Sequence, residues 1–204
     1  MNKLGYKDIK NITLCNLDIT NEINYNKHFN KETILYDIKD ITFDDCIFEN
    51  CIINSKLINC TFTNCKFINC NLTNAEFINC GIHYITITNS KLLNSAIDLS
   101  LLKNSIIEDS LCNLININSS ELNNTKFVNC SMKDARLFTN KLNKVVFKDN
   151  DLTNIEILNT SLKKVDLSNN KIKEIKISSE DIKGATISAD QIYDLINLLE
   201  VNIK

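Results

Sequence analysis

Large apolar residues recur at every fifth position over most of the chain. From Leu57 to Ile187 every residue in this five-step series is apolar. A five-residue period matches neither the 3.6-residue period of an α-helix nor the strict alternation of an exposed strand. The chain is therefore expected to turn after every five residues.

The residue two places before each large apolar residue is mostly small. Examples are Cys60, Cys65, Ala75 and Ser90. Four turns of five residues close a square coil of about twenty residues, and such coils stack through β-bridges at about 4.8 Å. The pattern thus predicts an all-β solenoid around one apolar column, with roughly seven to eight coils C-terminal to Asp40. Asn150 and Asn170 lie twenty residues apart at the small position and should stack as a side-chain ladder, because a buried amide needs partners.

Near the start the register of the repeat slips once. Phe43, Phe48 and Ile53 step by five, but Leu57 follows Ile53 by only four. Either one residue is missing around Asn54, or Ile52 takes the inward position. The stretch from Asn21 to Tyr36 breaks the pattern and is interpreted as an excursion within an N-terminal cap.

The C-terminal end of the repeat has a stop signal. Ser188 to Gln191 has the form of a capping box, and apolar residues from Ile192 onward fall at helical spacing. The helix can cover the open end of the apolar column. Tyr193, Leu198, Val201 and Ile203 have no later sequence to cover them, which predicts a homodimer through this region. The expected division is a cap over 1–37, a β-helix over 38–189, and a helix and dimerisation tail over 190–204.

Composition narrows the class of protein. The 204 residues include no Pro and three Gly, which disfavours a loop-rich enzyme. No stretch approaches the roughly 18 apolar residues of a membrane span, and the first residues lack the apolar core of a signal peptide. We therefore expect a soluble, cytoplasmic protein with no membrane partner.

Candidate catalytic or metal-binding residues are few. Eight of the nine cysteines fit inward positions of the repeat, with Cys15 unassigned, and five-residue spacing does not bring thiols to one point as zinc requires. His28 and His83 lie in different contexts, and a filled rod offers no cleft for acid–base chemistry. We expect no enzyme activity, cofactor, metal or small-molecule substrate.

Charge is sorted around the coil although the formal net charge is only −2. One face carries Lys103, Lys141, Lys144, Lys163, Lys164 and Lys183 against two carboxylates, and the next carries Glu108, Asp109, Asp149 and Asp166 against three lysines. The bulk charge gives no reason to expect direct nucleic-acid binding, so partners have to be argued from charge placement.

The repeat resembles the pentapeptide-repeat family. The segment that shows it best, residues 65–80, reads CKFINCNLTNAEFINC. The C-terminal third (151–172 and 184–204) and residues 11–29 look like those of Qnr-type quinolone-resistance proteins. This resemblance implies a right-handed quadrilateral parallel β-helix that dimerises through its C-terminal helix. It also implies a DNA-like rod that binds DNA gyrase and topoisomerase IV and protects them from quinolones.

A groove that binds DNA is lined with Lys and Arg, so a segment that occupies it should present carboxylates. We expect Asp98, Glu108, Asp109 and Asp149, together with the dimer centre, to contact the topoisomerase. The alternative is a pentapeptide-repeat scaffold that binds an unrelated protein through its flat faces.

Overall fold

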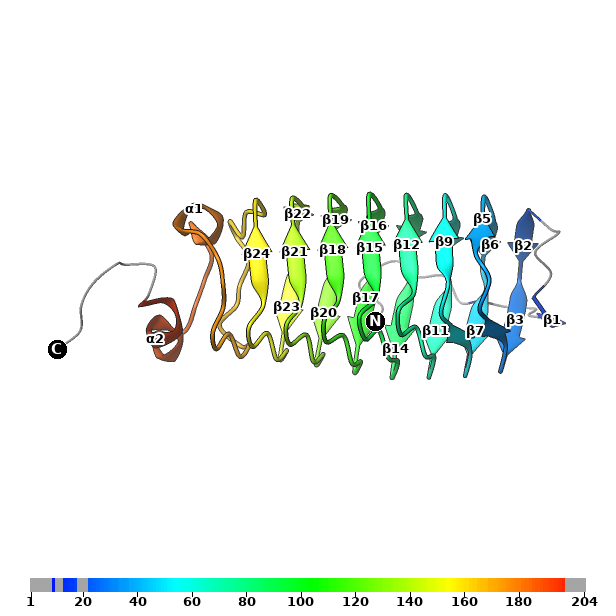
Figure 1. Cartoon of the computed structure of the whole chain (residues 1–204), viewed down its shortest axis with the longest axis horizontal. Coiled ribbons are helices and arrows are strands. Elements are labelled where there is room, and N and C mark those ends of the chain that lie inside the picture. The colour runs from blue at the N-terminus through cyan, green and yellow to red at the C-terminus, as the bar shows by residue number, and fades with distance from the viewer. Residues whose placement is uncertain (1–8, 10–12, 18–21, 197–204) are drawn as a thin grey trace.

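The protein is a parallel β-helix in a computed structural model that describes residues 9, 13–17 and 22–196. Coils follow one another along a rod, with short helices at the C-terminal end (Figure 1). Each coil has four faces, numbered here 1 to 4 in chain order from Leu57. The predicted all-β solenoid is confirmed, and every strand pair within the described residues is parallel.

Three of the four faces are continuous sheets. Face 1 contains β5 (Ile38–Lys39), β9 (Lys56–Ile58), β12 (Glu76–Ile78), β15 (Ala96–Asp98), β18 (Asn116–Asn118), β21 (Arg136–Phe138) and β24 (Glu156–Leu158). Face 2 contains β2 (Ile23–Tyr25), β6 (Thr42–Asp44), β10 (Thr61–Thr63), β13 (Gly81–His83), β16 (Leu101–Lys103), β19 (Glu121–Asn123) and β22 (Lys141–Asn143). Face 3 contains β1 (Thr13–Leu14), β3 (Lys27–Asn30), β7 (Ile47–Glu49), β11 (Lys66–Ile68), β14 (Thr86–Thr88), β17 (Ile106–Glu108), β20 (Lys126–Val128) and β23 (Val146–Lys148).

Face 4 is built differently. It begins with β4 (Thr33–Ile34) and β8 (Ile52–Ile53) and continues as single β-bridges. These bridges run in twenty-residue steps from Asn71 to Lys171. Each later coil makes a tight turn after its inward residue, as in the hydrogen bond from Ala75 N to Leu72 O.

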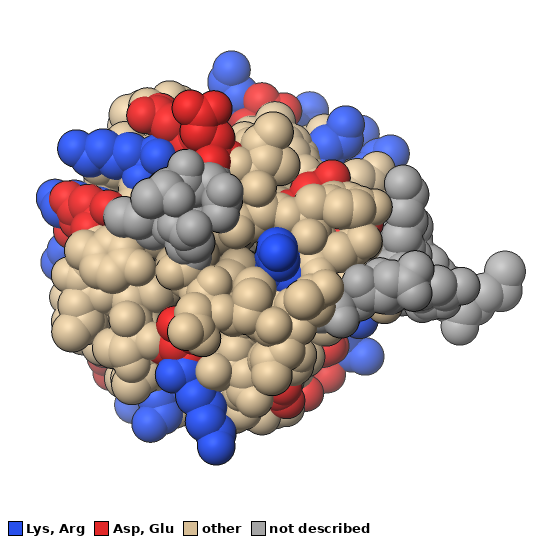
Figure 2. All heavy atoms as spheres, turned by 90° about the vertical axis from the view of Figure 1, so that its right-hand side faces the viewer, with Lys and Arg blue, Asp and Glu red and all other residues tan. Residues whose placement is uncertain are grey.

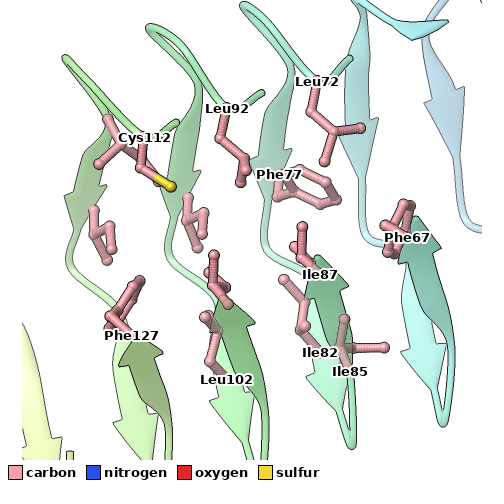
Figure 3. Packing of buried hydrophobic residues seen from close by; sticks show 14 of the residues in the cluster. Phe67, Leu72, Phe77, Ile82, Ile85, Ile87, Leu92, Leu102, Cys112 and Phe127 are labelled. Atoms are coloured by element: carbon pink, nitrogen blue, oxygen red, sulfur yellow. The ribbon is translucent and has the colours of Figure 1, made fainter. Parts of the chain in front are cut away.

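The inward residue of each five-residue unit packs into one axial column (Figure 3). The column is buried from Phe29 to Ile172, except that Leu142 is partly exposed. The phenyl rings of Phe48 and Phe67 stack with centroids 4.6 Å apart, and those of Phe127 and Phe147 with centroids 5.3 Å apart. The column predicted from the period of five is therefore confirmed as far as Ile172, whereas Ile177, Ile182 and Ile187 are only partly buried and pack against its end.

Asparagine makes many of the corners. Among the described residues, 28 non-glycine residues have left-handed backbone with positive φ, and 14 of them are Asn. Asn reaches this conformation at lower cost than most residues because its short side chain hydrogen-bonds locally. The coil can therefore turn at every corner without a supply of Gly or Pro.

The register slip recurs at one corner. Ile53 is buried and Ile52 is 42% exposed, so one residue is missing between Ile53 and Leu57 and the alternative with Ile52 inward is wrong. The same four-residue step separates Ile34 from Ile38, and both residues are buried. The missing residue in each case is the left-handed corner residue between faces 4 and 1, which later coils supply from Asn74 onward.

The expected excursion from Asn21 to Tyr36 is wrong for the described residues. β2, β3 and β4 pair in register with β6, β7 and β8, so this stretch is a 19-residue coil of the β-helix. The pattern was obscured because the inward position at residue 24 is a buried Asn. The proposed boundary at residue 37 thus falls inside the β-helix.

Helices replace strands at the C-terminal end. A short α1 (Ser179–Ile182), which the sequence did not predict, begins where the Ser178 side chain accepts a hydrogen bond from Asp181 N at 3.0 Å. The predicted end helix is present as the 3-10 turn η1 (Ala189–Gln191) and α2 (Ile192–Leu195). Gln191 covers the end of the column, because its amide nitrogen donates to the backbone oxygens of Leu167 (2.9 Å) and Asn170 (2.6 Å).

Candidate partner-binding surface

The corners of the rod form straight rows of outward side chains. Residues twenty apart stack on the same corner, so any charge at a corner is repeated along the axis at multiples of about 4.8 Å. Neighbours in a row are joined by amide hydrogen bonds, such as Asn124 Nδ2 to Asn104 Oδ1 at 2.7 Å. The rows are therefore ordered, and their sequence decides what the surface presents.

Asp109 and Asp149 belong to one such row, at the corner between faces 3 and 4. Two coils separate them, or roughly 10 Å along the axis. Asn129 lies between them and donates its amide to Asp109 Oδ1 at 2.7 Å. Glu108 immediately precedes this corner at the end of β17, so three of the four predicted carboxylates lie together.

Asp98 does not join them. It ends β15 on face 1, across the coil from face 3, and accepts a hydrogen bond from Asn118 Nδ2 at 2.8 Å. Asp98 and Asp109 differ by eleven residues, close to half a coil, which places them on opposite sides of the rod. The four predicted residues are thus not one patch.

A third aspartate, which the sequence analysis missed, completes the patch. Asp151 lies on face 4 and lines a hollow of about 370 Å³ together with Asp109, Asn129 and Asp149. Its position between the inward residues Asn150 and Leu152, two residues after Asp149, was the available signal. We call Glu108, Asp109, Asp149 and Asp151 the carboxylate row.

The members of the carboxylate row differ in how far they are neutralised. Asp151 receives Lys133 and Lys171, each at 3.4 Å. Although partial burial acts to raise it, hydrogen bonds from Thr153 and the charge of Lys171 hold the pKa of the Asp151 carboxyl below its usual value. Asp149 has a loose contact of 3.9 Å with the neighbouring Lys148. Within the described part of the chain, the Asp109 carboxylate accepts only the Asn129 amide, so its charge is available to a partner.

The two N-terminal coils form a second acidic region. Residues 22–50 contain seven Asp or Glu and three Lys. Asp40 and Asp45 occupy left-handed corners and accept amide hydrogen bonds from Asn59 (3.0 Å) and Asn64 (2.6 Å). Seen from this end, the charged side chains lie mainly around the rim of the rod (Figure 2).

The cysteines lie inside the solenoid. Eight of the nine are buried, and several donate to backbone oxygens, such as Cys65 Sγ to Phe43 O at 3.4 Å. Burial raises the pKa of the Cys65 thiol well above its ordinary value, which keeps it protonated. Within the described part of the chain, no group of three or more His, Cys, Asp or Glu side chains could hold a metal ion. The same part contains no helix of the length and apolar character that a membrane crossing needs.

Of the four predicted dimerisation residues, the structure describes one. Tyr193 lies in α2 and is 79% exposed, next to Ile192 at 51%. Leu198, Val201 and Ile203 lie outside the described residues. The dimer therefore stays a prediction, supported by the exposed apolar side of α2.

Comparison with known proteins agrees with the repeat. Residues 55–92 match the family model of pentapeptide repeats, with eight copies. Trypsin-treated QnrB1, a plasmid-mediated fluoroquinolone resistance protein, is 16% identical over 89% of this chain and 98% of its own, with a TM-score of 0.47. HetL, a pentapeptide repeat protein involved in heterocyst differentiation regulation in the cyanobacterium Nostoc, is 8% identical over 80% and 90% of the two chains, with a TM-score of 0.27. No curated protein sequence matches significantly.

Proposed function

We propose that this chain, a pentapeptide-repeat protein, binds type II topoisomerases as a DNA-like rod and protects DNA gyrase and topoisomerase IV from quinolones. The observation that carries the proposal is the carboxylate row. Asp109 and Asp149 stand on one straight corner two coils apart, and Glu108 and Asp151 flank that corner, so acidic groups are held along the rod axis as the phosphates of a duplex are. The resemblance of residues 151–172 and 184–204 to Qnr-type endings supports the same function.

The proposed contact uses Glu108, Asp109 and Asp149. A groove that binds DNA is lined with Lys and Arg, so exposed carboxylates on a rigid rod are complementary to it. The stiffness comes from the stacked coils and filled column, which hold the charges in place before binding. Asp98 is proposed to contribute separately, because it faces the other side of the rod.

In this function the protein acts by binding and not by catalysis, and it works in the cytoplasm as a homodimer. The dimer, proposed to form through Tyr193, Leu198, Val201 and Ile203, would align two rods end to end and lengthen the acidic surface. No cofactor or small-molecule substrate enters this function.

The test is gyrase supercoiling in the presence of ciprofloxacin, with and without the purified protein. We expect rescue by the native chain and loss of rescue by the triple variant Glu108→Lys, Asp109→Lys, Asp149→Lys. Its circular dichroism and Tm should be nearly unchanged, because no buried contact is removed. Sedimentation of the same samples should show dimers.

The matched control reverses three carboxylates outside the proposed contact, namely Glu76→Lys and Glu156→Lys on face 1 and Glu121→Lys on face 2. It changes the net charge by the same amount and leaves the carboxylate row intact, so it should keep most of the protection. Equal loss in both variants would mean that bulk charge, and not the row, governs binding. Absence of rescue by the native chain would favour the second candidate, a scaffold whose carboxylate row binds an unrelated basic protein.

A further inference from the structure

A second charged corner runs along the rod between faces 2 and 3. Two adjacent rows make up this corner. One row is the residue directly after each inward residue of face 2, and the other is the left-handed corner residue that follows it. From Lys103 to Gly184 these rows contain five Lys, four Asn and one Gly, and no Asp or Glu. We call this surface the lysine ridge, and its charged members are Lys103, Lys144, Lys163, Lys164 and Lys183.

All five lysines are exposed, and none forms an ion pair with another described residue. Five lysines elsewhere on the rod do form ion pairs, as Lys133 and Lys171 do with Asp151. Lys144 and Lys164 lie one coil apart on the same corner, so they repel each other. Exposed like charges kept side by side without counter-charges are available to an anionic partner.

The nearest carboxylates do not neutralise the ridge. Asp181 is buried in α1 and bonded to Ser178. Glu121 starts β19 on the far side of face 2, beside Lys141 in the register of the sheet. Asp166, on the face-3 side, accepts hydrogen bonds from Ser168 N (2.9 Å) and Ser168 Oγ (2.6 Å). His83 precedes Lys103 in the same row; burial together with the charge of Lys103 lowers the pKa of its imidazole, which favours the neutral form, so His83 does not extend the positive charge of the ridge.

The composition of the ridge selects among polyanions. Protein interfaces are depleted in Lys and enriched in aromatic residues, and the two rows carry no aromatic side chain between residues 103 and 184. Single-stranded nucleic acid is usually held by stacking its bases on aromatic rings, which are absent here. A straight line of Lys with Asn donors matches a phosphate backbone, which is contacted by Lys and by amide side chains.

We propose that the lysine ridge binds the phosphate backbone of duplex DNA without sequence preference. The ridge spans four coil steps, or roughly 19 Å, which is a little over half a turn of B-form DNA. The carboxylate row lies on the next corner, across face 3, and faces a different direction. The rod could therefore hold a basic protein on one corner and DNA on another, although the ridge does not depend on the topoisomerase proposal.

The test is fluorescence polarisation of a labelled duplex of about 20 base pairs with the full chain alone, at salt concentrations from about 50 to 200 mM. The variant is Lys144→Gln, Lys163→Gln, Lys164→Gln. The matched control, Lys133→Gln, Lys171→Gln, Lys173→Gln, removes the same charge from ion-paired lysines of face 4.

Native protein should bind with an affinity that falls linearly with salt on logarithmic axes. The ridge variant should bind at least about tenfold more weakly at low salt, and its salt slope should be shallower by about 2.7, or 0.9 for each lost phosphate contact. The control should bind like the native chain.

Three results would overturn the proposal. They are no binding by the native chain at low salt, equal weakening in the control, and binding to vesicles that contain phosphatidylserine in preference to the duplex. Because no topoisomerase is present, each result leaves the gyrase experiment to be judged by itself.

Discussion

The N-terminal and C-terminal halves of the rod share one backbone and fill it with different chemistry. Up to Phe77 the column is rich in stacked Phe, and the small inward positions are mostly Cys. Beyond residue 81 the column is mostly Ile and Leu, and the small positions are mostly Ser, Thr and Asn, with Ile or Val at some of them. The coil therefore constrains size and direction at each position more than it constrains chemistry.

The two kinds of small residue hold the coils together in different ways. Cys Sγ atoms donate weakly to backbone oxygens at 3.1–3.7 Å. Ser100 Oγ donates to Asp98 O at 2.8 Å and also accepts from Cys80 N at 2.9 Å. Asn150 does the same over a longer reach, which links three coils through one side chain. Packing therefore dominates the first half, and hydrogen bonds add to it in the second.

The largest effect should come from removing a stacked ring. Phe67→Ala is expected to lower the free energy of unfolding by about 3–5 kcal/mol, because it leaves a cavity beside Phe48 and Phe62. Urea denaturation followed by circular dichroism measures it. The comparison variant Ile107→Ala, on the same face of the second half, should cost about 2–4 kcal/mol. A larger cost at Ile107 would show that ring stacking does not distinguish the first half.

The second-largest loss of stability should come from breaking the side-chain ladder of Asn150 and Asn170. Asn150→Ala leaves Cys130 N and Phe127 O buried without their partners and should cost about 2–3 kcal/mol. The control Asn143→Ala removes an exposed amide contact to Asn123 and should change stability by less than about 0.5 kcal/mol. Hydrogen exchange should locate the loss of protection at residues 127–130. Equal effects of the two variants would mean that the ladder adds nothing beyond surface amides.

The smallest change in stability should come from exchanging Cys and Ser at the small inward positions. Cys65→Ser keeps the inward size and its donor and should change the free energy of unfolding by less than about 1 kcal/mol. The reciprocal Ser105→Cys weakens the acceptor for Ile85 N and should cost about 1–2 kcal/mol. Thermal denaturation of both variants measures the difference. A larger loss from Cys65→Ser would show that the first half depends on thiols specifically.

The sequence predicted the structure correctly at positions where packing accepts only one kind of side chain. The apolar column, the four-residue step after Ile53 and the Asn150–Asn170 ladder all follow from what a buried position accepts. The prediction failed at Asn24, because a buried Asn occupies an inward position that is usually apolar. It also failed at α1, where the apolar spacing of five continues although the backbone is helical.

The candidate site was predicted less completely for a physical reason. Packing does not select the outward side chains, so their residue types do not indicate which of them lie together. Only the position of each residue within the coil indicates that. Counting in steps of twenty placed Asp109 and Asp149 on one face from the sequence, and the same count applied to Asp98 and Asp151 would have separated Asp98 and placed Asp151 on the adjoining face 4.

The four-residue corner between faces 4 and 1 behaves like a dislocation in a crystal. The two 19-residue coils share the defect and fit each other, so the mismatch is confined to the single boundary with the first 20-residue coil. At that boundary Ser55 Oγ is buried and has no hydrogen-bond partner among the described residues. A deletion in mid-rod would create two such boundaries, whereas one near an end creates one. Changes of coil length during evolution should therefore collect at the ends of the rod, while its middle grows or shrinks only by whole turns.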